Sequence, residues 1–203
     1  MPLPILSVLI LIFILWLHYE IRKSSKNSKL ASDSFLEKEM KANHVRRADI
    51  SGLNYITLQP EQLPLADNED ETINSYRDTI LGLVNKKILN LSGYTNIDLK
   101  NKYGSANLSS LQDYENNYTI MVSILHKWAE RLYHNGDTPK AKTILEYAIS
   151  LGSDVTNTYK LLAEIYRKQD TPEKIDDLIQ TASKLTIYNK DKLITDLEGS
   201  KLF

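Results

Sequence analysis

The chain begins with a long run of apolar residues. Leu3 to Tyr19 contains no charged side chain, and the aromatic residue Trp16 also stands near the end of the run. A helix of about 17 residues is close to the shortest that crosses a membrane, and aromatic side chains gather at membrane interfaces. We therefore predict a transmembrane anchor at residues 3–19.

A cleavable signal peptide is the alternative reading of this run. Such a peptide has basic residues before its apolar part and small residues at its cleavage site, but no Lys or Arg precedes Leu3. The basic residues follow the run instead, between Arg22 and Lys29. Because basic residues stay on the cytoplasmic side, we predict a single-pass protein of the cell membrane, with its N-terminus outside and its C-terminal domain in the cytoplasm.

Polar residues dominate the next segment. Residues 20–33 are rich in Ser, Lys and Asn and lack apolar periodicity, which is typical of a flexible basic linker. Ser34 and Glu37 then have the spacing of a capping box, in which the two side chains satisfy the first amides of a helix. This spacing predicts that a short helix begins at residue 34.

An apolar strip with prolines follows this short helix. Pro60 and Pro64 interrupt the strip between Leu53 and Leu65, and each proline lacks the amide proton that a helix needs. We therefore predict a short helix plus an extended arm over residues 34–66, with the arm lying on the domain that follows.

From residue 67 onward, apolar residues recur every three or four positions, as in amphipathic helices. One apolar face covers residues 73–91. A second covers residues 108–132, either as one long helix or as two with a break at Asn116-Asn117. Gly136 follows the second face, where a left-handed residue often ends a helix. The pattern predicts one helical domain over residues 67–203.

The C-terminal half contains an internal repeat. When the chain is displaced so that Ala129 lies on Ala163, Ala148 also lies on Ala182. The other superimposed pairs are Leu125 and Tyr159, Trp128 and Leu162, Leu132 and Tyr166, and Leu151 and Leu185. This period, about 34 residues, is the length of the tetratricopeptide repeat, a pair of antiparallel helices. Small residues let such helices approach closely, while large residues fill the groove between them.

Residues 122–155 and 156–189 therefore resemble two degenerate tetratricopeptide repeats. Three positions depart from the family pattern: Asp170 replaces a turn glycine, Ile175 a small residue, and Ile187 a terminal proline. An unrelated array of helical hairpins is the alternative. The expected fold class is all-α, with an N-terminal transmembrane helix followed by an antiparallel helical array, a tetratricopeptide-like α-solenoid, and an extended arm.

The composition argues against several kinds of chemistry. With 25 Lys and Arg against 26 Asp and Glu, the chain has no positive excess to favour nucleic acid. It lacks Cys and therefore disulfides and thiolate metal sites. No phosphate-binding loop or metalloprotease motif occurs, and His126 and His134 are too far apart along a helix to share a metal ion. We expect no cofactor, no metal, no small-molecule substrate and no catalysis, with an enzyme of unrecognised type as the alternative.

The resemblance implies a binding role. It suggests a scaffold or adaptor that recruits a protein or peptide partner at the cytoplasmic membrane face; the alternative is a structural subunit of a larger membrane complex. The candidate partner-binding residues lie on the first helix of each repeat and are Lys127, Arg131, Lys160 and Glu164. The tract Leu89–Tyr103 is either a further recognition surface or only a capped turn between helices, for which its Ser, Gly, Thr, Asn and Asp residues are typical.

Overall fold

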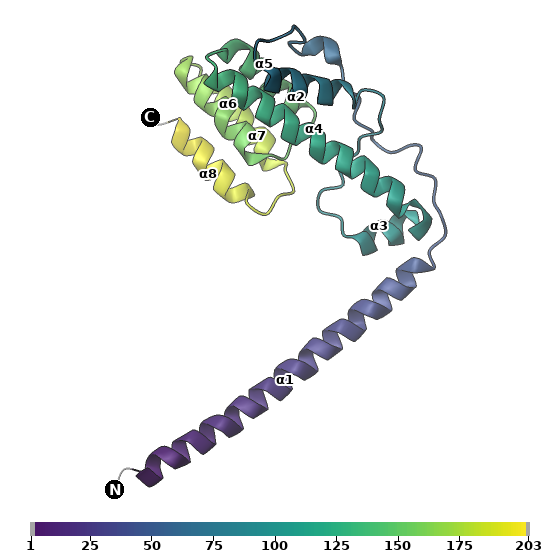
Figure 1. Cartoon of the computed structure of the whole chain (residues 1–203), viewed down its shortest axis with the longest axis vertical. Helices are drawn as coiled ribbons and strands as arrows, with labels where there is room; N and C mark the ends of the chain where they lie inside the picture. Colours follow the sequence, from purple (N-terminus) through teal and green to yellow (C-terminus); the bar gives the residue numbers. More distant parts are fainter. Residues whose placement is uncertain (1–2, 202–203) are drawn as a thin grey trace. The chain divides into compact units, whose positions relative to one another are not determined.

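Helices make up all the regular secondary structure of the described chain (Figure 1). The computed structural model describes the backbone of residues 3–201 and the side chains of residues 7–26 and 32–201. The chain divides into two compact units. The first consists of residues up to 48 together with residues 95–108, and the second of residues 49–94 together with those from 109 onward.

The longest helix, α1 (Leu3–Asn43), belongs to the first unit. Its described uncharged stretch, Ser7–Tyr19, is followed within the same helix by Glu20 and Arg22. Among the described residues, no helix combines the length and apolar character that a membrane crossing requires. The predicted transmembrane anchor at residues 3–19, and the cell-membrane localisation derived from it, are therefore wrong. The side chains of residues 3–6, where this prediction begins, lie outside the described residues.

The structure also differs from the prediction of a flexible linker at residues 20–33, because α1 runs through them without a break. No glycine or proline occurs in this part of α1 to interrupt the helix. Glu37 and Lys41 add an ion pair of 2.7 Å one turn apart. The side chains of residues 27–31, including the basic Lys29, lie outside the described part.

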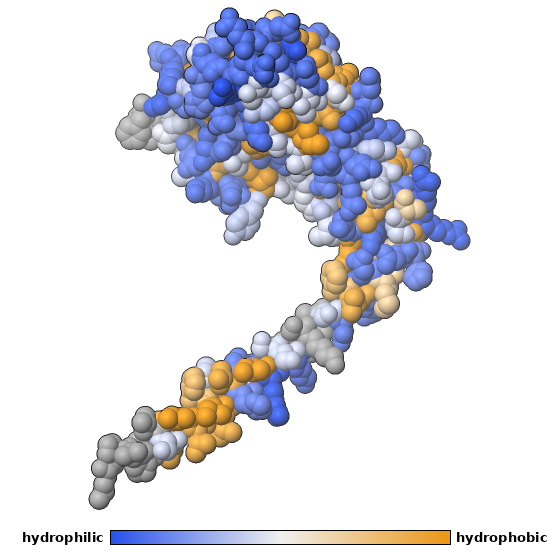
Figure 2. Space-filling view, viewed as in Figure 1, coloured by the Kyte–Doolittle hydropathy of each residue, from blue (hydrophilic) through white to orange (hydrophobic). Residues whose placement is uncertain are grey.

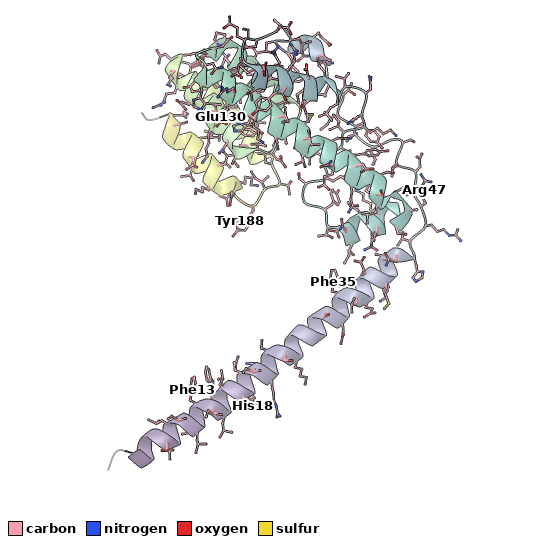
Figure 3. All side chains as sticks on the ribbon, in the orientation of Figure 1. Phe13, His18, Phe35, Arg47, Glu130 and Tyr188 are labelled. Carbon is pink, nitrogen blue, oxygen red and sulfur yellow. The ribbon has the colours of Figure 1, made fainter. Side chains whose placement is uncertain are left out.

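Apolar side chains on α1 are exposed. Figure 2 shows them over residues 8–21, and Figure 3 shows Phe13, His18 and Phe35 projecting outward from the helix. Phe13 is 56 % exposed and Phe35 is likewise 56 % exposed. The sequence pattern has no polar face along residues 8–17, so the apolar character surrounds the helix there.

The rest of the first unit consists of α3 (Asn96–Tyr103), the 3-10 turn η2 (Ser105–Asn107) and the segment that follows α1. The Ala48 amide donates to the Tyr103 carbonyl at 3.0 Å. The fully buried Asn107 amide donates to the Ala48 and Tyr103 carbonyls, at 2.7 Å each, and its oxygen accepts from Arg47 Nε at 3.0 Å. One buried amide side chain thus holds the segment after α1 against α3.

The second unit is a stack of antiparallel helices (Figure 1). Its helices are α2 (Glu71–Leu81), α4 (Leu108–His134), α5 (Thr138–Ser150), α6 (Thr156–Lys168), α7 (Glu173–Ser183) and α8 (Lys190–Ser200). α5 packs on α6, α6 packs on α7, and α8 packs on both α6 and α7. α4 is one unbroken helix, since Asn116-Asn117 lies inside it.

The core of the second unit follows the internal repeat. Trp128 and Tyr159 are its largest fully buried side chains. The superimposed positions that are buried in both repeats are Leu125 with Tyr159, Trp128 with Leu162, Ala129 with Ala163, Leu132 with Tyr166, Ala141 with Ile175, Ile144 with Leu178 and Ala148 with Ala182. Leu193 and Leu197 of α8 continue the register of Tyr159 and Ala163 and are also buried. The outer face of α8 is polar.

The turns after α4 and α6 have the same backbone geometry. Gly136 has a φ of 87°, and Asp170, at the equivalent position, is the one residue other than glycine with positive φ in the described chain, at 55°. The amides of the next residues reach back to equivalent carbonyls: Asp137 to Leu132 at 2.9 Å and Thr171 to Tyr166 at 3.1 Å. Asp tolerates the left-handed conformation better than most residues do, so Asp170 takes the place of the expected turn glycine without changing the turn.

Replacing Asp170 by valine is expected to lower the free energy of unfolding by about 1–2 kcal/mol, because a β-branched side chain clashes with its own backbone at positive φ. Asp170→Gly, which is free of that clash, should equal or exceed the wild type in stability. Urea titration of the three proteins measures the difference. Equal midpoints for the valine variant and the wild type would contradict the left-handed geometry.

The arm lies on the second unit as an extended segment with one short 3-10 turn, η1 (Pro60–Gln62). Leu58 and Leu63 are buried in the core of this unit. The Gln59 amide donates to the hydroxyl of Tyr147 in α5 at 2.7 Å, and the Ile56 amide donates to the Ile88 carbonyl at 2.9 Å. The arm is therefore held by the buried Leu58 and Leu63, by Ile56 and Leu65 packed against the same core, and by a small number of hydrogen bonds from its backbone.

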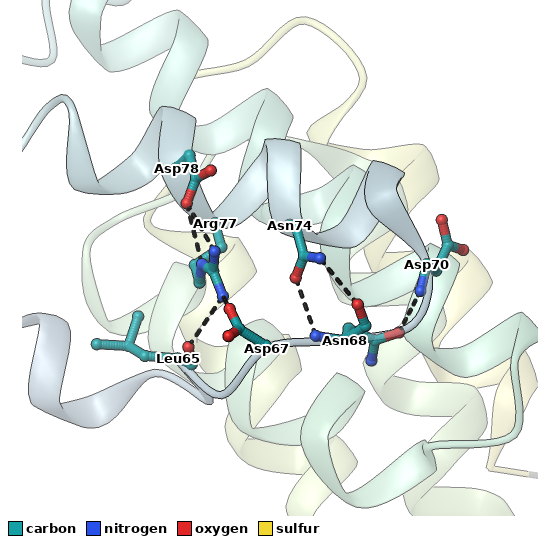
Figure 4. Close-up of polar contacts among 7 residues, drawn as sticks. All are labelled: Leu65, Asp67, Asn68, Asp70, Asn74, Arg77 and Asp78. Carbon is teal, nitrogen blue, oxygen red and sulfur yellow. Dashed lines mark hydrogen bonds and ion pairs between the residues drawn. The ribbon is translucent and has the colours of Figure 1, made fainter.

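The end of the arm is held by polar contacts with α2 (Figure 4). Arg77 pairs with Asp67 at 2.5 Å and also donates to the Leu65 carbonyl at 3.3 Å. Asn74 and Asn68 exchange two hydrogen bonds, since the Asn68 amide donates to the Asn74 side chain at 3.0 Å and that side chain donates back at 2.8 Å. These contacts fix where the arm ends and α2 begins.

Buried tyrosines should make the second unit sensitive to high pH. Burial, with the nearby Asp154 carboxylate, raises the pKa of Tyr159 to about 12, and burial also raises the pKa of Tyr118 and Tyr166. These phenols stay neutral in the folded state while their unfolded counterparts ionise near pH 10. Their stabilising contribution is thus complete below about pH 10 and is lost as the pH rises towards 12. Thermal melts should show a fall in Tm across this window that is shallower for Tyr159→Phe. A pH-independent Tm from 9 to 12 would contradict the burial.

Candidate binding groove

Arg131, one of the candidate partner-binding residues, is engaged inside the protein. Its Nε lies 2.6 Å from Asp70 Oδ2, and Asn135 donates to the same carboxylate at 3.1 Å. Asp70 caps α2 by accepting from the Thr72 amide at 3.0 Å. Arg131 and then Asn135 lower the pKa of Asp70 to about 2. Arg131 therefore links α4 to the start of α2.

The variant Arg131→Met keeps the aliphatic stem and removes the charge, so the pKa of Asp70 should rise towards its ordinary value of about 3.9. A depressed carboxylate pKa contributes stability that is present above about pH 3.9 and is lost as the pH falls towards 2. Carboxyl NMR titration of Asp70 checks this. An unchanged pKa in the variant would show that the ion pair does not form in solution.

Of the other three candidate residues, two contact neighbouring helices and one is exposed to solvent. Lys160 pairs with Asp196 of α8 at 2.6 Å. Glu164 accepts from the Tyr133 hydroxyl at 2.7 Å. Lys127 is exposed. The four side chains thus do not form one common surface: Arg131, Lys160 and Glu164 connect neighbouring helices of the array.

The tract Leu89–Tyr103 is divided between the two units at Thr95. Thr95 and Asp98 form a complete capping box at the start of α3, which accounts for these two polar residues. Within the first unit, part of the tract lines a hollow of about 560 Å³, together with Phe35 and Lys38 of α1. The tract is therefore a capped turn whose helix also borders a surface hollow.

A second hollow is acidic. Asp67, Glu69, Asp70 and Asp137 line it, with a volume of about 580 Å³. Asp70 is already satisfied by Arg131, and Asp137 caps α5 and pairs with Lys140. In the part of the chain with described side chains, no group of three His, Asp or Glu residues is arranged to hold a metal ion.

The third hollow is a groove formed by α5, α6 and α7, which we call the α5–α7 groove. Its volume is about 350 Å³. It is lined by Glu146, Ile149 and Ser150 of α5, Leu162 and Tyr166 of α6, and Lys174, Asp177, Leu178 and Thr181 of α7. The α6 residues and Leu178 are buried, while Ser150 and Asp177 are exposed. The groove therefore has an apolar floor and a polar rim.

Tyr166 of the floor makes several polar contacts. Its hydroxyl donates to Glu146 Oε1 at 2.8 Å. The ammonium groups of Lys142 and Lys174 lie 5.4 and 5.3 Å from the centre of its ring, within the range of cation–π attraction. Burial and then the Glu146 carboxylate raise the pKa of this phenol. The aromatic part of the floor is thus a neutral ring in contact with three charged side chains, those of Glu146, Lys142 and Lys174.

The sequence-based prediction missed the residues of the groove, because it placed partner contacts on the first helix of each repeat. Ser150 and Thr181 stand on the second helices, where polar residues between apolar ones are also typical of a plain solvent face. That α5 and α7 line the same groove with α6 depends on how the helices stack, and helical periodicity alone does not give that information.

Comparison with known proteins adds no further assignment. No family model matches the chain, and no curated protein or solved structure matches it either.

Proposed function

We propose that this protein is a non-catalytic helical scaffold that binds a segment of a protein partner in the α5–α7 groove. The observation that carries the proposal is the combination of an apolar floor, Leu162, Tyr166 and Leu178, with a polar rim in an open groove of about 350 Å³. Peptide-binding sites commonly join apolar anchoring positions to a few polar groups that set orientation.

The array supports this role. When the first repeat is displaced onto the second, the same positions are buried, for example Leu125 with Tyr159. The turns at Gly136 and Asp170 also have the same backbone hydrogen bonds. Stacked helical repeats offer elongated grooves between successive hairpins, and proteins built in this way commonly bind other proteins. The resemblance to tetratricopeptide repeats supports the same proposal.

Selection from a library of random dodecapeptides against the full chain tests this function. Selected peptides should bind the wild type and lose at least about tenfold in affinity for Thr181→Trp, where an indole fills the groove. Ser150→Trp fills it from the opposite wall and should have the same effect. Gln180→Trp, on the exposed face of α7, is the matched control and should bind within about twofold of the wild type. Equal binding by all four proteins, or no selected peptide, would exclude the groove.

A structural subunit of a larger assembly is the second candidate function. The observation that favours it is the exposure of apolar side chains on α1: Leu15 is 69 % exposed and Trp16 is 56 % exposed. Exposed apolar patches of this kind mark interaction surfaces. A subunit should co-purify with its partners in a fixed ratio, whereas a scaffold should exchange its peptide partner on dilution.

A further inference from the structure

The two hydroxyl groups on the rim of the α5–α7 groove donate their protons to their own helices. The Ser150 hydroxyl donates to the Tyr147 carbonyl at 2.7 Å, and the Thr181 hydroxyl donates to the Asp177 carbonyl at 2.8 Å. A carbonyl oxygen can only accept a hydrogen bond, so each hydroxyl has already used its single proton. Towards a ligand, these two rim groups therefore act as hydrogen-bond acceptors.

Two carboxylates on the rim are acceptors as well. Glu146 accepts from the Tyr166 hydroxyl at 2.8 Å. Asp177 lines the groove and is exposed. An ionised carboxylate has no proton to donate. The rim thus offers acceptor oxygens on both of its walls, α5 and α7, and a ligand that satisfies them must bring donors.

Lys174 supplies the donor protons of the rim. Its ammonium group lies 5.3 Å from the centre of the Tyr166 ring, at the opposite end of the α7 wall from Thr181. The cation–π attraction keeps this charge near the ring. Asp177 stands between these two ends, one turn after Lys174 and one turn before Thr181. Its exposed carboxylate is therefore accessible to a positively charged ligand.

The floor restricts which cation fits. Leu162 and Leu178 are buried floor residues, and Ile149 beside them is partly buried. A side chain that joins a long aliphatic stem to a cationic head can cover such a floor while its head stays at the rim. Lysine and arginine both have this form. Arginine matches the acceptors better, because its planar guanidinium can bind a carboxylate through two parallel hydrogen bonds and has further donors for a neighbouring oxygen.

We propose that the α5–α7 groove binds an arginine side chain of the partner segment, with the guanidinium on the Asp177 carboxylate and the aliphatic stem on Leu162 and Leu178. The inference rests on the proposed function and specifies the chemistry of its ligand. The Thr181 hydroxyl oxygen accepts one of the remaining guanidinium protons. The apolar floor and the acceptor-rich rim are thus used by one side chain.

The peptides selected from the random dodecapeptide library are the probe. They should be enriched in arginine relative to the starting library. Replacement of that arginine by norleucine, which keeps an aliphatic chain without the charge, should weaken binding at least about threefold at low ionic strength. Replacement by lysine should cause a smaller loss. The difference between the arginine and norleucine peptides should shrink at about 1 M salt.

Variants of the full chain locate the guanidinium. Asp177→Asn should weaken binding of the arginine peptide at least about threefold and leave the norleucine peptide unaffected. Asp177→Lys should weaken the arginine peptide at least about tenfold and favour a peptide with glutamate in its place. Asp176→Asn is the matched control, because Asp176 pairs with Lys201 at 2.6 Å and does not line the groove, so it should bind like the wild type.

The outcomes separate the two proposals. Selected peptides that are blocked by Thr181→Trp but are not enriched in arginine would overturn the inference and leave the proposed function standing. The same holds if Asp177→Asn binds the arginine peptide like the wild type, or weakens the arginine and norleucine peptides equally. If the library yields no binding peptide, both proposals fail.

Discussion

Replacement of Trp128 by alanine is expected to lower the free energy of unfolding by about 3–5 kcal/mol, enough to unfold a domain of ordinary stability. Trp128 is 1 % exposed and lies in the cluster that joins α4 to α5, α6 and the arm. The truncation leaves a cavity that the surrounding helices cannot close, because each is fixed by its own neighbours. Denaturant unfolding followed by circular dichroism measures the loss.

Two further variants make this result specific. Trp16→Ala removes the other tryptophan of the chain, which is 56 % exposed on α1, and should leave the unfolding midpoint unchanged. Trp128→Phe should lose less than the alanine variant, because it keeps most of the buried volume and removes an indole Nε1 that is buried without a hydrogen-bond partner. A loss below about 1 kcal/mol for Trp128→Ala would contradict the described core.

Replacement of Gly104 by alanine is expected to separate the segment after α1 from α3. Gly104 has a φ of 83°, and an added Cβ would lie 2.5 Å from the Arg46 carbonyl oxygen and 2.8 Å from Arg47 Cα. Those neighbours are backbone atoms, which cannot rotate away as a side chain would. The strained conformation and the clash together should raise the opening rate of the Ala48 amide, which bonds to Tyr103, by at least about a hundredfold.

Amide hydrogen exchange on the full chain measures that opening. Gly52→Ala is the matched control, because a Cβ at Gly52 meets no atom within 4 Å. Protection at Ala48 should be unchanged in the control. Equal protection in both variants would show that Gly104 does not approach Arg46 in solution.

Much of the second unit could be predicted from the sequence, because each helix carries a regular apolar face. The face from Leu108 to Leu132 corresponds to α4, and Pro60 and Pro64 interrupt helix formation within the arm. The displacement by one repeat identified the positions that are buried in both hairpins, such as Trp128 and Leu162. Local periodicity is sufficient to predict these helices and their buried residues, since an amphipathic helix buries its apolar face wherever it packs.

Other features depended on interactions that the sequence pattern does not contain. Arg131 looked like an exposed binding residue, but it pairs with Asp70, 61 positions earlier in the chain. The polar residues 20–33 looked like a linker, yet no glycine or proline interrupts the helix there. The groove itself requires α5 and α7 to lie on the same side of α6, a relation set by helix stacking and not by any single helix.

The footprint of a bound peptide tests the central claim most directly. Hydrogen exchange of the full chain, with and without a selected library peptide, should show added protection on both walls of the α5–α7 groove, at residues 146–150 and 174–181. Residues 190–200 of α8 and the exposed face around Lys127 should exchange at unchanged rates. Protection confined to α8 or to the Lys127 face, with none on α5 and α7, would contradict the account.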